Sequence, residues 1–278
     1  MNIPDTFSWQ GHRGARGLLP ENSVPAFLKA LELGMNTLEL DIAVSADAQI
    51  IVTHEPWLSA EICTDKQGNE MTEETGKKLR IYEMTAAAIA NYDCGTKPHP
   101  RFAEQKKLRT HKPTLDEVAA AADAYARQHK LPLPHYNIEI KSQPDYDTVL
   151  TPPIADFVAL TVKTVRELGI AERCNLQSFD LRALEEIHKQ APDIPVAYLV
   201  ESATDTEAAL SLLTFKPEIY SPYYPLVNQK MRDLTRRRGI KIIPWTVNDV
   251  EVMKKLIALG VDGIITDYPN RAAALDGF

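Results

Sequence analysis

The sequence predicts an α/β protein of the (β/α)8 TIM barrel class. Short apolar runs rich in β-branched residues alternate with longer segments of helical period, which is typical of parallel strands joined by crossover helices. From the third run onward they recur every ~20 to 35 residues, as repeated strand–helix units do. The expected strands lie near residues 8–12, 36–42, 136–141, 173–177, 195–199, 217–221, 240–245 and 262–266. An open doubly wound sheet is the alternative, but no GxGxxG motif follows the first strand to favour a dinucleotide-binding version.

The segments between these strands carry helix start signals. A helix is expected from Glu21 to Leu33, with Asn22 or Ser23 as its N-cap. A second is expected from Thr114 to His129, where Thr114 and Glu117 have the spacing of a capping box. These helices would cover the outer face of the barrel.

The regular alternation stops at residues 55 to about 113, where Lys, Gln, Glu, Thr, Pro and Gly dominate. We interpret residues 1–278 as a single barrel domain with this stretch as a small insertion after the second unit, capping one face and shaping a pocket. A solvated excursion without a role is the alternative. Ile50-Ile51-Val52-Thr53, just ahead of it, could form a short extra strand.

Composition narrows the class of protein. With 278 residues, 44% of them apolar and 25% charged, the chain resembles an ordinary globular protein that buries a substantial core. The net charge of −7 argues against a nucleic-acid partner, because binding to a phosphate backbone depends on basic patches. A small substrate with one phosphate is still compatible, since a local Arg/Lys pair can hold it.

The cysteines and the N-terminus bear on location. Cys63, Cys94 and Cys174 are odd in number and form no CxxC pattern, so we expect incidental thiols, without a disulfide framework or a thiolate zinc site. The N-terminus shows no signal-peptide pattern, and no apolar run is long enough for an integral membrane segment. We therefore expect a soluble cytoplasmic protein; a periplasmic one would look the same after its signal peptide was removed.

Carboxylates cluster on two of the predicted strands. In the run from Thr37 to Ile42 the alternation places the apolar side chains on the helix side and turns Glu39 and Asp41 inward. Glu139 and Lys141 repeat the pattern on the next strand. Inward carboxylates repel and are costly to desolvate unless a cation offsets them. Three of them suit one hard divalent cation, Mg²⁺ or Ca²⁺, better than zinc, and buried salt bridges with Lys141 or Arg13 are the alternative.

Two histidines follow predicted strands at the barrel end where such enzymes carry their catalytic groups. His12 and His54 could act as an acid/base pair, because imidazoles titrate near neutrality. Arg13 and Lys141 could hold a phosphate and stabilise charge developing during phosphoryl transfer. The remaining histidines lack comparable partners in the sequence and are expected to be structural: His99, His111, His129, His135 and His188.

These residues, in this order, resemble the glycerophosphodiester phosphodiesterase family. The matching text is Gly11-His12-Arg13-Gly14, Pro20-Glu21-Asn22-Ser23, Glu39-Leu40-Asp41, His54 and Glu139-Ile140-Lys141, with weaker matches at Gln177-Ser178-Phe179, Trp245-Thr246-Val247-Asn248 and Gly263 to Pro269. The likeness covers nearly the whole chain. It implies a (β/α)8 barrel with an insertion after the second unit.

The resemblance also implies roles for individual residues. Glu39, Asp41 and Glu139 would bind the divalent cation, and His12 and His54 would be the acid/base pair. Arg13 and Lys141 would hold phosphate, Glu21 would buttress the His-Arg loop, and Trp245 would line the pocket near the glycerol or alcohol group. Two departures from the family pattern occur: Ser23 where Thr is common, and Glu55 where Asp is common, which puts the detailed metal geometry in question.

The expected activity is metal-dependent hydrolysis of a small glycerophosphodiester to an alcohol and glycerol 3-phosphate. Lysophospholipase D or phospholipase C-like activity on a lipid diester is the first alternative, although the insertion segment from Thr64 to Glu70 is strongly polar. A non-catalytic barrel that binds phosphorylated ligands is the second, but such a binder would not need two proton-transfer groups. The sequence leaves open the nucleophile, the assignment of acid and base, and whether the protein forms a homodimer.

Overall fold

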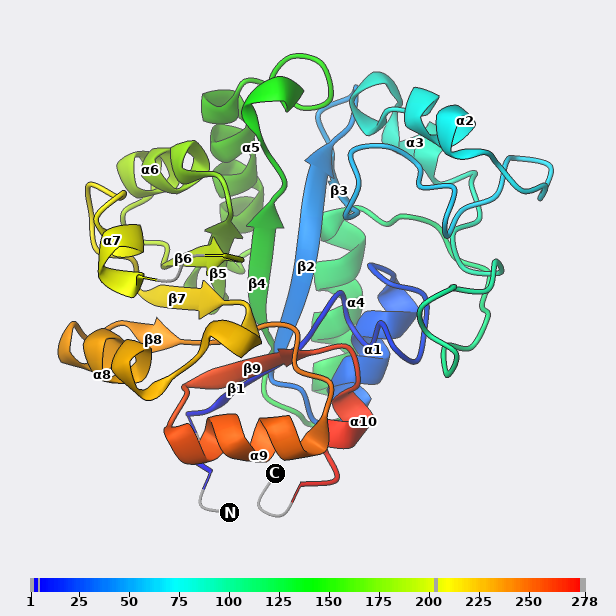
Figure 1. Ribbon diagram of the computed structural model, residues 1–278. Coiled ribbons are helices and arrows are strands. Elements are labelled where there is room, and N and C mark those ends of the chain that lie inside the picture. The colour runs from blue at the N-terminus through cyan, green and yellow to red at the C-terminus, as the bar shows by residue number, and fades with distance from the viewer. Residues whose placement is uncertain (1–2, 5, 203–204, 276–278) are drawn as a thin grey trace.

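The computed structural model describes residues 3–4, 6–202 and 205–275, and it forms a barrel of parallel strands surrounded by helices (Figure 1). In the hydrogen-bonded sheet the strand order is β8-β7-β6-β5-β4-β2-β1-β9, and all neighbours on this path are parallel. The strands are β1 (Ser8–Gly11), β2 (Thr37–Val44), β3 (Ile50–Val52), β4 (His135–Ile140), β5 (Cys174–Ser178), β6 (Val196–Val200), β7 (Ile219–Pro222), β8 (Lys241–Ile242) and β9 (Gly263–Thr266). The predicted barrel is confirmed.

The barrel closes between β8 and β9 through separate backbone hydrogen bonds. The amide of Asp262 donates to the carbonyl of Ile242 at 2.9 Å, and that of Ile265 donates to Pro244 at 3.0 Å. Val247 in turn donates to Ile265 at 2.9 Å. The strand predicted at 240–245 is shorter in the structure because Pro244 has no N–H to donate to a ladder.

Helices cover the outer face of the sheet, and in Figure 1 their colours run from blue near the N-terminus to red near the C-terminus. The α-helices are α1 (Val24–Glu32), α2 (Glu73–Lys78), α3 (Ala86–Ile89), α4 (Leu115–Gln128), α5 (Ile154–Glu167), α6 (Leu181–Gln190), α7 (Thr206–Leu210), α8 (Gln229–Arg237), α9 (Val250–Leu259) and α10 (Pro269–Ala272). Short 3-10 turns lie at Ile81–Glu83, Pro144–Tyr146, Ala171–Arg173 and Tyr224–Leu226. Ser23 caps α1, and Thr114 and Glu117 form the predicted capping box of α4.

The two faces of each strand contact different cores. Leu38, Leu40 and Ile42 on β2 are fully buried in the large apolar cluster between sheet and helices. Ala197, Ile219, Ile243 and Ile265 form a separate cluster together with Trp245. The alternation on β2 therefore turns Glu39 and Asp41 away from the helices, as predicted.

The segment between β3 and α4 has a core of its own. β3 pairs antiparallel with β2, which confirms the extra strand predicted at residues 50–53. Leu58, Ile81 and Ile89 are fully buried in a cluster that the barrel helices do not supply. A loop with this many buried apolar side chains is a folded excursion, so the alternative of a merely solvated one is wrong.

Cys63 and Cys94 form a disulfide inside this segment, and both are buried. The expectation of incidental thiols is therefore wrong for this pair, although it holds for Cys174, which is free and buried. Sequence spacing hid the bond because the partners are separated by 31 residues and meet only when the insertion folds. Among the described residues, no helix has the length and apolar character needed to cross a lipid bilayer.

Candidate active site

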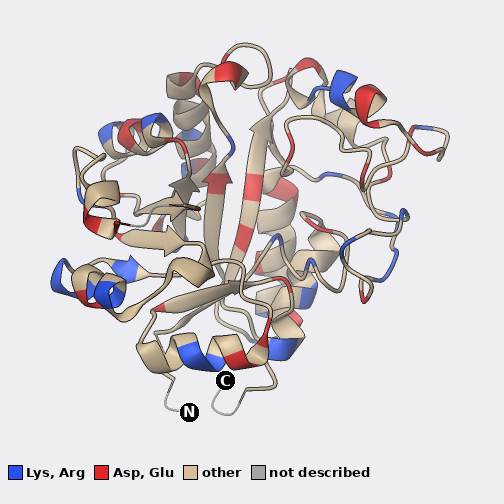
Figure 2. Cartoon of the chain, viewed as in Figure 1, with Lys and Arg blue, Asp and Glu red and all other residues tan. Residues whose placement is uncertain are grey.

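Three carboxylates gather on the inner face of β2 and β4. Asp41 on β2 lies opposite Glu139 on β4 in the strand register, and Glu39 precedes Asp41 by two residues on the same face. One oxygen from each of the three lies within 4.8 Å of the others, and all three side chains are buried. Figure 2 shows these acidic positions along β2 and β4. The parallel register of β2 and β4 thus brings Glu139 together with Glu39 and Asp41, from which it is far apart in the sequence.

The charges of this acidic triad are only partly offset by protein cations. Arg13 Nε lies 3.2 Å from Asp41 Oδ2, and Lys141 Nζ lies 3.0 Å from Glu139 Oε1, so the ion pairs considered as an alternative are present. In the described part of the chain Glu39 pairs with neither an arginine nor a lysine side chain. Burial and the neighbouring carboxylates raise the pKa of Glu39 well above its usual value.

The triad fits a divalent cation bound by oxygen. Burial, opposed by Lys141 and reinforced by Asp41, raises the pKa of Glu139 to about 7. The Arg13 guanidinium holds the pKa of Asp41 far below its usual range in spite of burial, so this carboxylate stays ionised. Its Oδ1 atom is buried without a hydrogen-bond partner. Among the described residues the site thus combines an unpaired oxygen of Asp41 with two carboxyl groups, Glu39 and Glu139, whose pKa values are raised by burial. A hard divalent cation would bind these oxygens and offset their charge.

His12 follows β1 and faces the triad. Its Nδ1 lies 2.7 Å from Asp267 Oδ1, while its Nε2 lies 3.9 Å from Glu39 Oε2. Burial lowers the pKa of His12, although Asp267 opposes the shift. Since Asp267 remains a carboxylate, the neutral imidazole donates from Nδ1 and leaves the Nε2 lone pair directed at the site.

His54 follows β3 and has the same arrangement. Its Nδ1 lies 2.8 Å from Glu55 Oε1, and its Nε2 lies 3.1 Å from Lys141 Nζ. Because an ammonium only donates, Nε2 accepts and Nδ1 carries the proton toward Glu55. Burial lowers the pKa of His54, and Arg13 lowers it further. Glu55, the longer acid at this position, thus contacts His54 and stands outside the acidic triad.

A tight turn holds Arg13 beneath the site. Gly14 has a φ of +84°, and a Cβ there would lie 2.6 Å from the backbone of Ala26 in α1, so only glycine fits. Glu21 accepts from Arg13 Nη1 at 2.9 Å and from Arg16 Nε at 2.6 Å. The two guanidinium groups keep the pKa of Glu21 well below its usual value although burial opposes them. Glu21 therefore lies where a buttress of the His-Arg loop was expected.

A cavity of about 290 Å³ opens over the triad and brings most of the predicted residues together. Lys141 and both histidines line it, and Asp41 and Glu21 lie directly behind. Trp245 forms an aromatic wall, with its ring centroid 5.5 Å from that of Phe179, and its Nε1 donates to the carbonyl of Ser221 at 2.8 Å. The site thus has a charged floor and an aromatic side.

Sequence reasoning missed several residues of the site. Asp267 follows the last strand, so the rule that selected His12 could also have found it. Arg16 and Lys112 are buried next to Glu21, and Lys112 comes from the insertion, where no periodic pattern marks it. His99 was expected to be structural without comparable partners, but its buried Nε2 lies 3.7 Å from Glu21 Oε2.

The fold and this site define a (β/α)8-barrel enzyme with its reactive groups at the carboxyl ends of the strands. The model of the glycerophosphoryl diester phosphodiesterase family matches residues 12–271. The chain belongs to this family of phosphoric diester hydrolases. It is similar to a glycerophosphodiester phosphodiesterase from Caldanaerobacter subterraneus subsp. tengcongensis, with 30% identity and 93% of each chain covered.

Solved structures agree with the fold. The crystal structure of a candidate glycerophosphoryl diester phosphodiesterase from Silicibacter pomeroyi DSS-3 has a TM-score of 0.83 at 31% identity, covering 96% of this chain and 92% of that one. An Oleispira antarctica phosphodiesterase, solved with its product sn-glycerol-3-phosphate, has a TM-score of 0.74 at 21% identity, with 98% and 96% covered. The second likeness concerns the fold alone.

Proposed function

We propose that the protein hydrolyses small glycerophosphodiesters to an alcohol and glycerol 3-phosphate by metal-dependent, two-histidine acid/base catalysis. One observation carries the proposal: two neutral imidazoles, each oriented by a carboxylate on Nδ1, line one cavity together with a buried acidic triad. Neutral histidines with ordered tautomers are suited to exchange protons near neutrality. Membership of the family supports the same reaction.

Glu39, Asp41 and Glu139 would hold one divalent cation, Mg²⁺ or Ca²⁺. When bound, the cation would act as a Lewis acid toward the phosphate and offset the charge of the triad. Gln177 donates to Glu39 Oε1 at 2.8 Å and Asn22 donates to Asp41 Oδ2 at 2.9 Å, so outer contacts already orient the ligands.

The remaining side chains would bind the substrate and move protons. Lys141 lies between Glu139 and His54 and would contact a non-bridging phosphate oxygen, with Arg13 adding positive charge from below. One histidine would take a proton from the nucleophile and the other would protonate the departing alkoxide. Trp245 would pack against the glycerol or alcohol group.

The nucleophile is either water or the glycerol 2-hydroxyl of the substrate. Water attack places one solvent oxygen in the product phosphate directly, whereas the hydroxyl forms a cyclic phosphate first. Product analysis in ¹⁸O-labelled water, with early time points searched for the cyclic ester, separates the two routes.

The proposed reaction is tested by release of glycerol 3-phosphate from glycerophosphocholine and glycerophosphoethanolamine. Turnover is measured after EDTA treatment and after Mg²⁺ or Ca²⁺ is restored, for the wild type, His12→Ala and the control His129→Ala, which changes a histidine at the end of α4. We expect metal-dependent turnover that only His12→Ala abolishes. An inactive metal-loaded wild type would refute the small-diester proposal and make lysophospholipids the next substrates.

The disulfide bears on where the reaction takes place. Disulfides persist in oxidising compartments and are rare in the reducing cytoplasm. The buried Cys63–Cys94 bond therefore supports the periplasmic alternative over the cytoplasmic expectation. Thiol labelling of the protein taken from its native host, with and without prior reduction, would tell whether the bond is formed there.

A further inference from the structure

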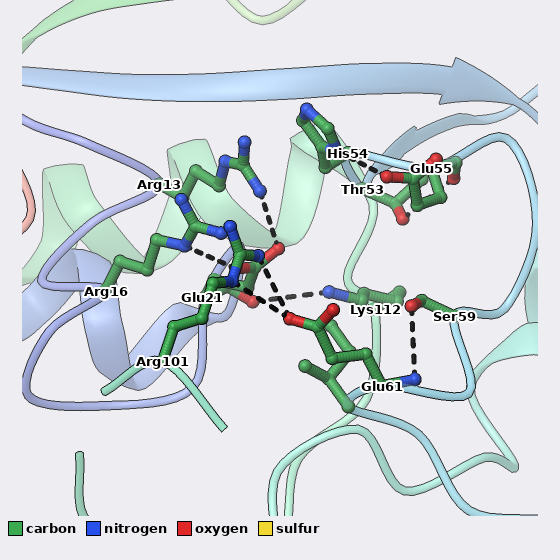
Figure 3. Close-up of a pocket in the computed structure, with 11 residues that line it drawn as sticks. Arg13, Arg16, Glu21, Thr53, His54, Glu55, Ser59, Glu61, Arg101 and Lys112 are labelled. Carbon is green, nitrogen blue, oxygen red and sulfur yellow. Dashed lines mark hydrogen bonds and ion pairs between the residues drawn. The ribbon is translucent and has the colours of Figure 1, made fainter. Parts of the chain in front are cut away.

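A second cavity of about 200 Å³ lies between the barrel and the insertion (Figure 3). It shares Arg13, Arg16 and His54 with the cavity over the triad, so the two spaces adjoin at the end where the phosphate would sit. Its opposite wall comes from the insertion, through Ser59, Glu61 and Lys112. A glycerophosphodiester bound at the triad carries two groups on its phosphate, the glycerol and the alcohol, which we call its two arms. The second cavity lies beside the expected phosphate position, on the side away from Trp245.

Most of the charged groups around the second cavity are paired with one another, and Lys112 is the exception. Figure 3 shows Arg13 and Arg16 meeting Glu21, and Arg101 meeting Glu61. Arg101 Nη2 lies 3.0 Å from Glu61 Oε1. A positively charged ligand would have to break one of these pairs to reach a carboxylate and would also meet the Lys112 ammonium, which favours an alcohol group without positive charge.

Hydrogen-bonding capacity nevertheless remains on the cavity wall. Lys112 is buried, and among the described residues its ammonium makes one hydrogen bond, of 3.3 Å, to the carbonyl of Glu21; burial lowers its pKa to about 8. In the described chain the second carboxylate oxygen of Glu61 accepts no hydrogen bond, and Ser59 lends its hydroxyl only as an acceptor for the Glu61 amide. The cavity wall therefore offers both hydrogen-bond donors and acceptors.

A buried histidine lies behind this wall. His99 Nδ1 accepts from the amide of Arg101 at 3.2 Å, so the proton resides on Nε2. Among the described residues that Nε2 makes no hydrogen bond of ordinary geometry, and it lies 3.4 Å from Glu61 Oε1 and 3.7 Å from Glu21 Oε2. His99 therefore supports these two carboxylates from behind and is not part of the cavity lining.

The lining excludes two other kinds of alcohol group. Among the described residues no Phe, Tyr or Trp lines the second cavity, so it offers no cage for a quaternary ammonium such as choline. Ile62 is its one aliphatic lining residue, which gives an acyl chain almost no apolar surface to bury. The hydroxyl groups of a polyhydroxy alcohol both donate and accept hydrogen bonds, so they can bind to the donors and acceptors of this cavity wall.

We propose that this second cavity is the subsite for the alcohol arm of the diester and that it selects a neutral polyhydroxy alcohol, such as glycerol or inositol. The inference rests on the proposed hydrolysis at the triad. It assigns to the insertion the choice of alcohol group, with Glu61, Ser59 and Lys112 as specificity-determining residues.

The test compares kcat/KM for glycerophosphoinositol and glycerophosphocholine. We expect the wild type to prefer the inositol diester about tenfold or more, since sites built to hydrogen-bond a hydroxyl reject ligands that lack it. Ser59→Phe, which fills the cavity, and Glu61→Gln should each reduce that preference about tenfold. Glu104→Gln is the matched control, because Glu104 is an insertion carboxylate paired with Arg271 at 2.7 Å outside both cavities, and it should leave the preference unchanged.

Two results would overturn the subsite. One is a wild type that prefers the choline diester, and the other is an inositol preference that Ser59→Phe leaves intact. Failure of the proposed reaction looks different, because then neither diester releases glycerol 3-phosphate. In that case binding of free myo-inositol, followed by ligand-observed NMR in wild type and Ser59→Phe, decides the subsite separately: binding lost in the variant supports it, and no binding to the wild type refutes it.

Discussion

Replacing Asp267 with asparagine tests whether His12 works as an oriented base or acid. Asp267 accepts from His12 Nδ1 at 2.7 Å and is itself held by Asn248 Nδ2 at 2.7 Å. An asparagine amide can donate to Nδ1, which would move the imidazole proton to Nε2, the atom that faces the triad. The variant would keep the shape of the site while giving His12 the wrong tautomer.

The expected loss can be worked out from this geometry. Two unit charges about 4 Å apart attract by roughly 4 kcal/mol at an effective dielectric constant of about 20. Losing this stabilisation of the imidazolium that forms during proton transfer corresponds to roughly 10³-fold in rate, since ~1.4 kcal/mol is a factor of ten. We therefore expect kcat/KM of Asp267→Asn to fall about 10²- to 10⁴-fold, the range typical of general acid–base catalysis.

Steady-state kinetics on glycerophosphoethanolamine across pH provides the assay. Burial lowers the pKa of His12, and Asp267 opposes this shift. Removing the charge of Asp267 should therefore lower the pKa of His12 further and move the corresponding limb of the pH–rate profile to lower pH. Asp249→Asn is the control, because Asp249 caps α9 nearby and asparagine caps equally well. A kcat/KM for Asp267→Asn within threefold of wild type would refute the assigned role.

Three further predictions concern the metal, the insertion and the loop. Metal binding should weaken about tenfold or more from pH 8 to pH 6 by calorimetry, because the Glu139 pKa of about 7 and the raised pKa of Glu39 make protons compete with the cation; a flat profile would contradict this. Reduction of Cys63–Cys94, which closes a span of 31 residues, should cost about 3 to 4 kcal/mol. Hydrogen exchange should then rise across residues 55–113 first, and a simultaneous rise throughout the barrel would disprove a local role. Glu21→Gln should lower stability by about 3 to 5 kcal/mol in denaturant titrations, because it leaves two buried guanidinium groups without a full counter-charge; an unchanged midpoint would show that the buttress is dispensable.

Matched controls accompany these three measurements. Glu139→Gln should remove the pH dependence attributed to that carboxyl, although its metal affinity also falls. Cys174→Ser separates the effect of reducing the disulfide from any effect of the free buried thiol. Glu83→Gln removes an exposed carboxylate paired with Arg80 and should change stability by less than about 1 kcal/mol.

Local sequence patterns were sufficient for the barrel and for most of its reactive groups. Apolar runs at regular spacing mark buried parallel strands, and period-two alternation decides which side chains of β2 face inward. His12 and His54 were found because each lies just past the end of such a run, and the triad was found because strand alternation turns its carboxylates inward. These signals are local, since each depends on residues within one strand and the turn that follows it.

The structure of the insertion could not be predicted from such local patterns. The segment between β3 and α4 has two short α-helices and one 3-10 turn, and it is held by side-chain packing and by one disulfide. Its sequence therefore shows no periodicity from which to place Lys112, His99 or Glu61, and the pairing of Cys63 with Cys94 was missed for the same reason.

The sequence by itself thus determined the class of fold, the acidic triad and the two histidines, because strand periodicity and strand ends are written in consecutive residues. Only the tertiary structure decided the partners that tune them: Asp267 on His12, Glu55 on His54, and Glu21 between two arginines. Hydrogen bonds and desolvation depend on distances between segments far apart in the chain. Protonation states, and the second cavity beneath the insertion, follow from those distances.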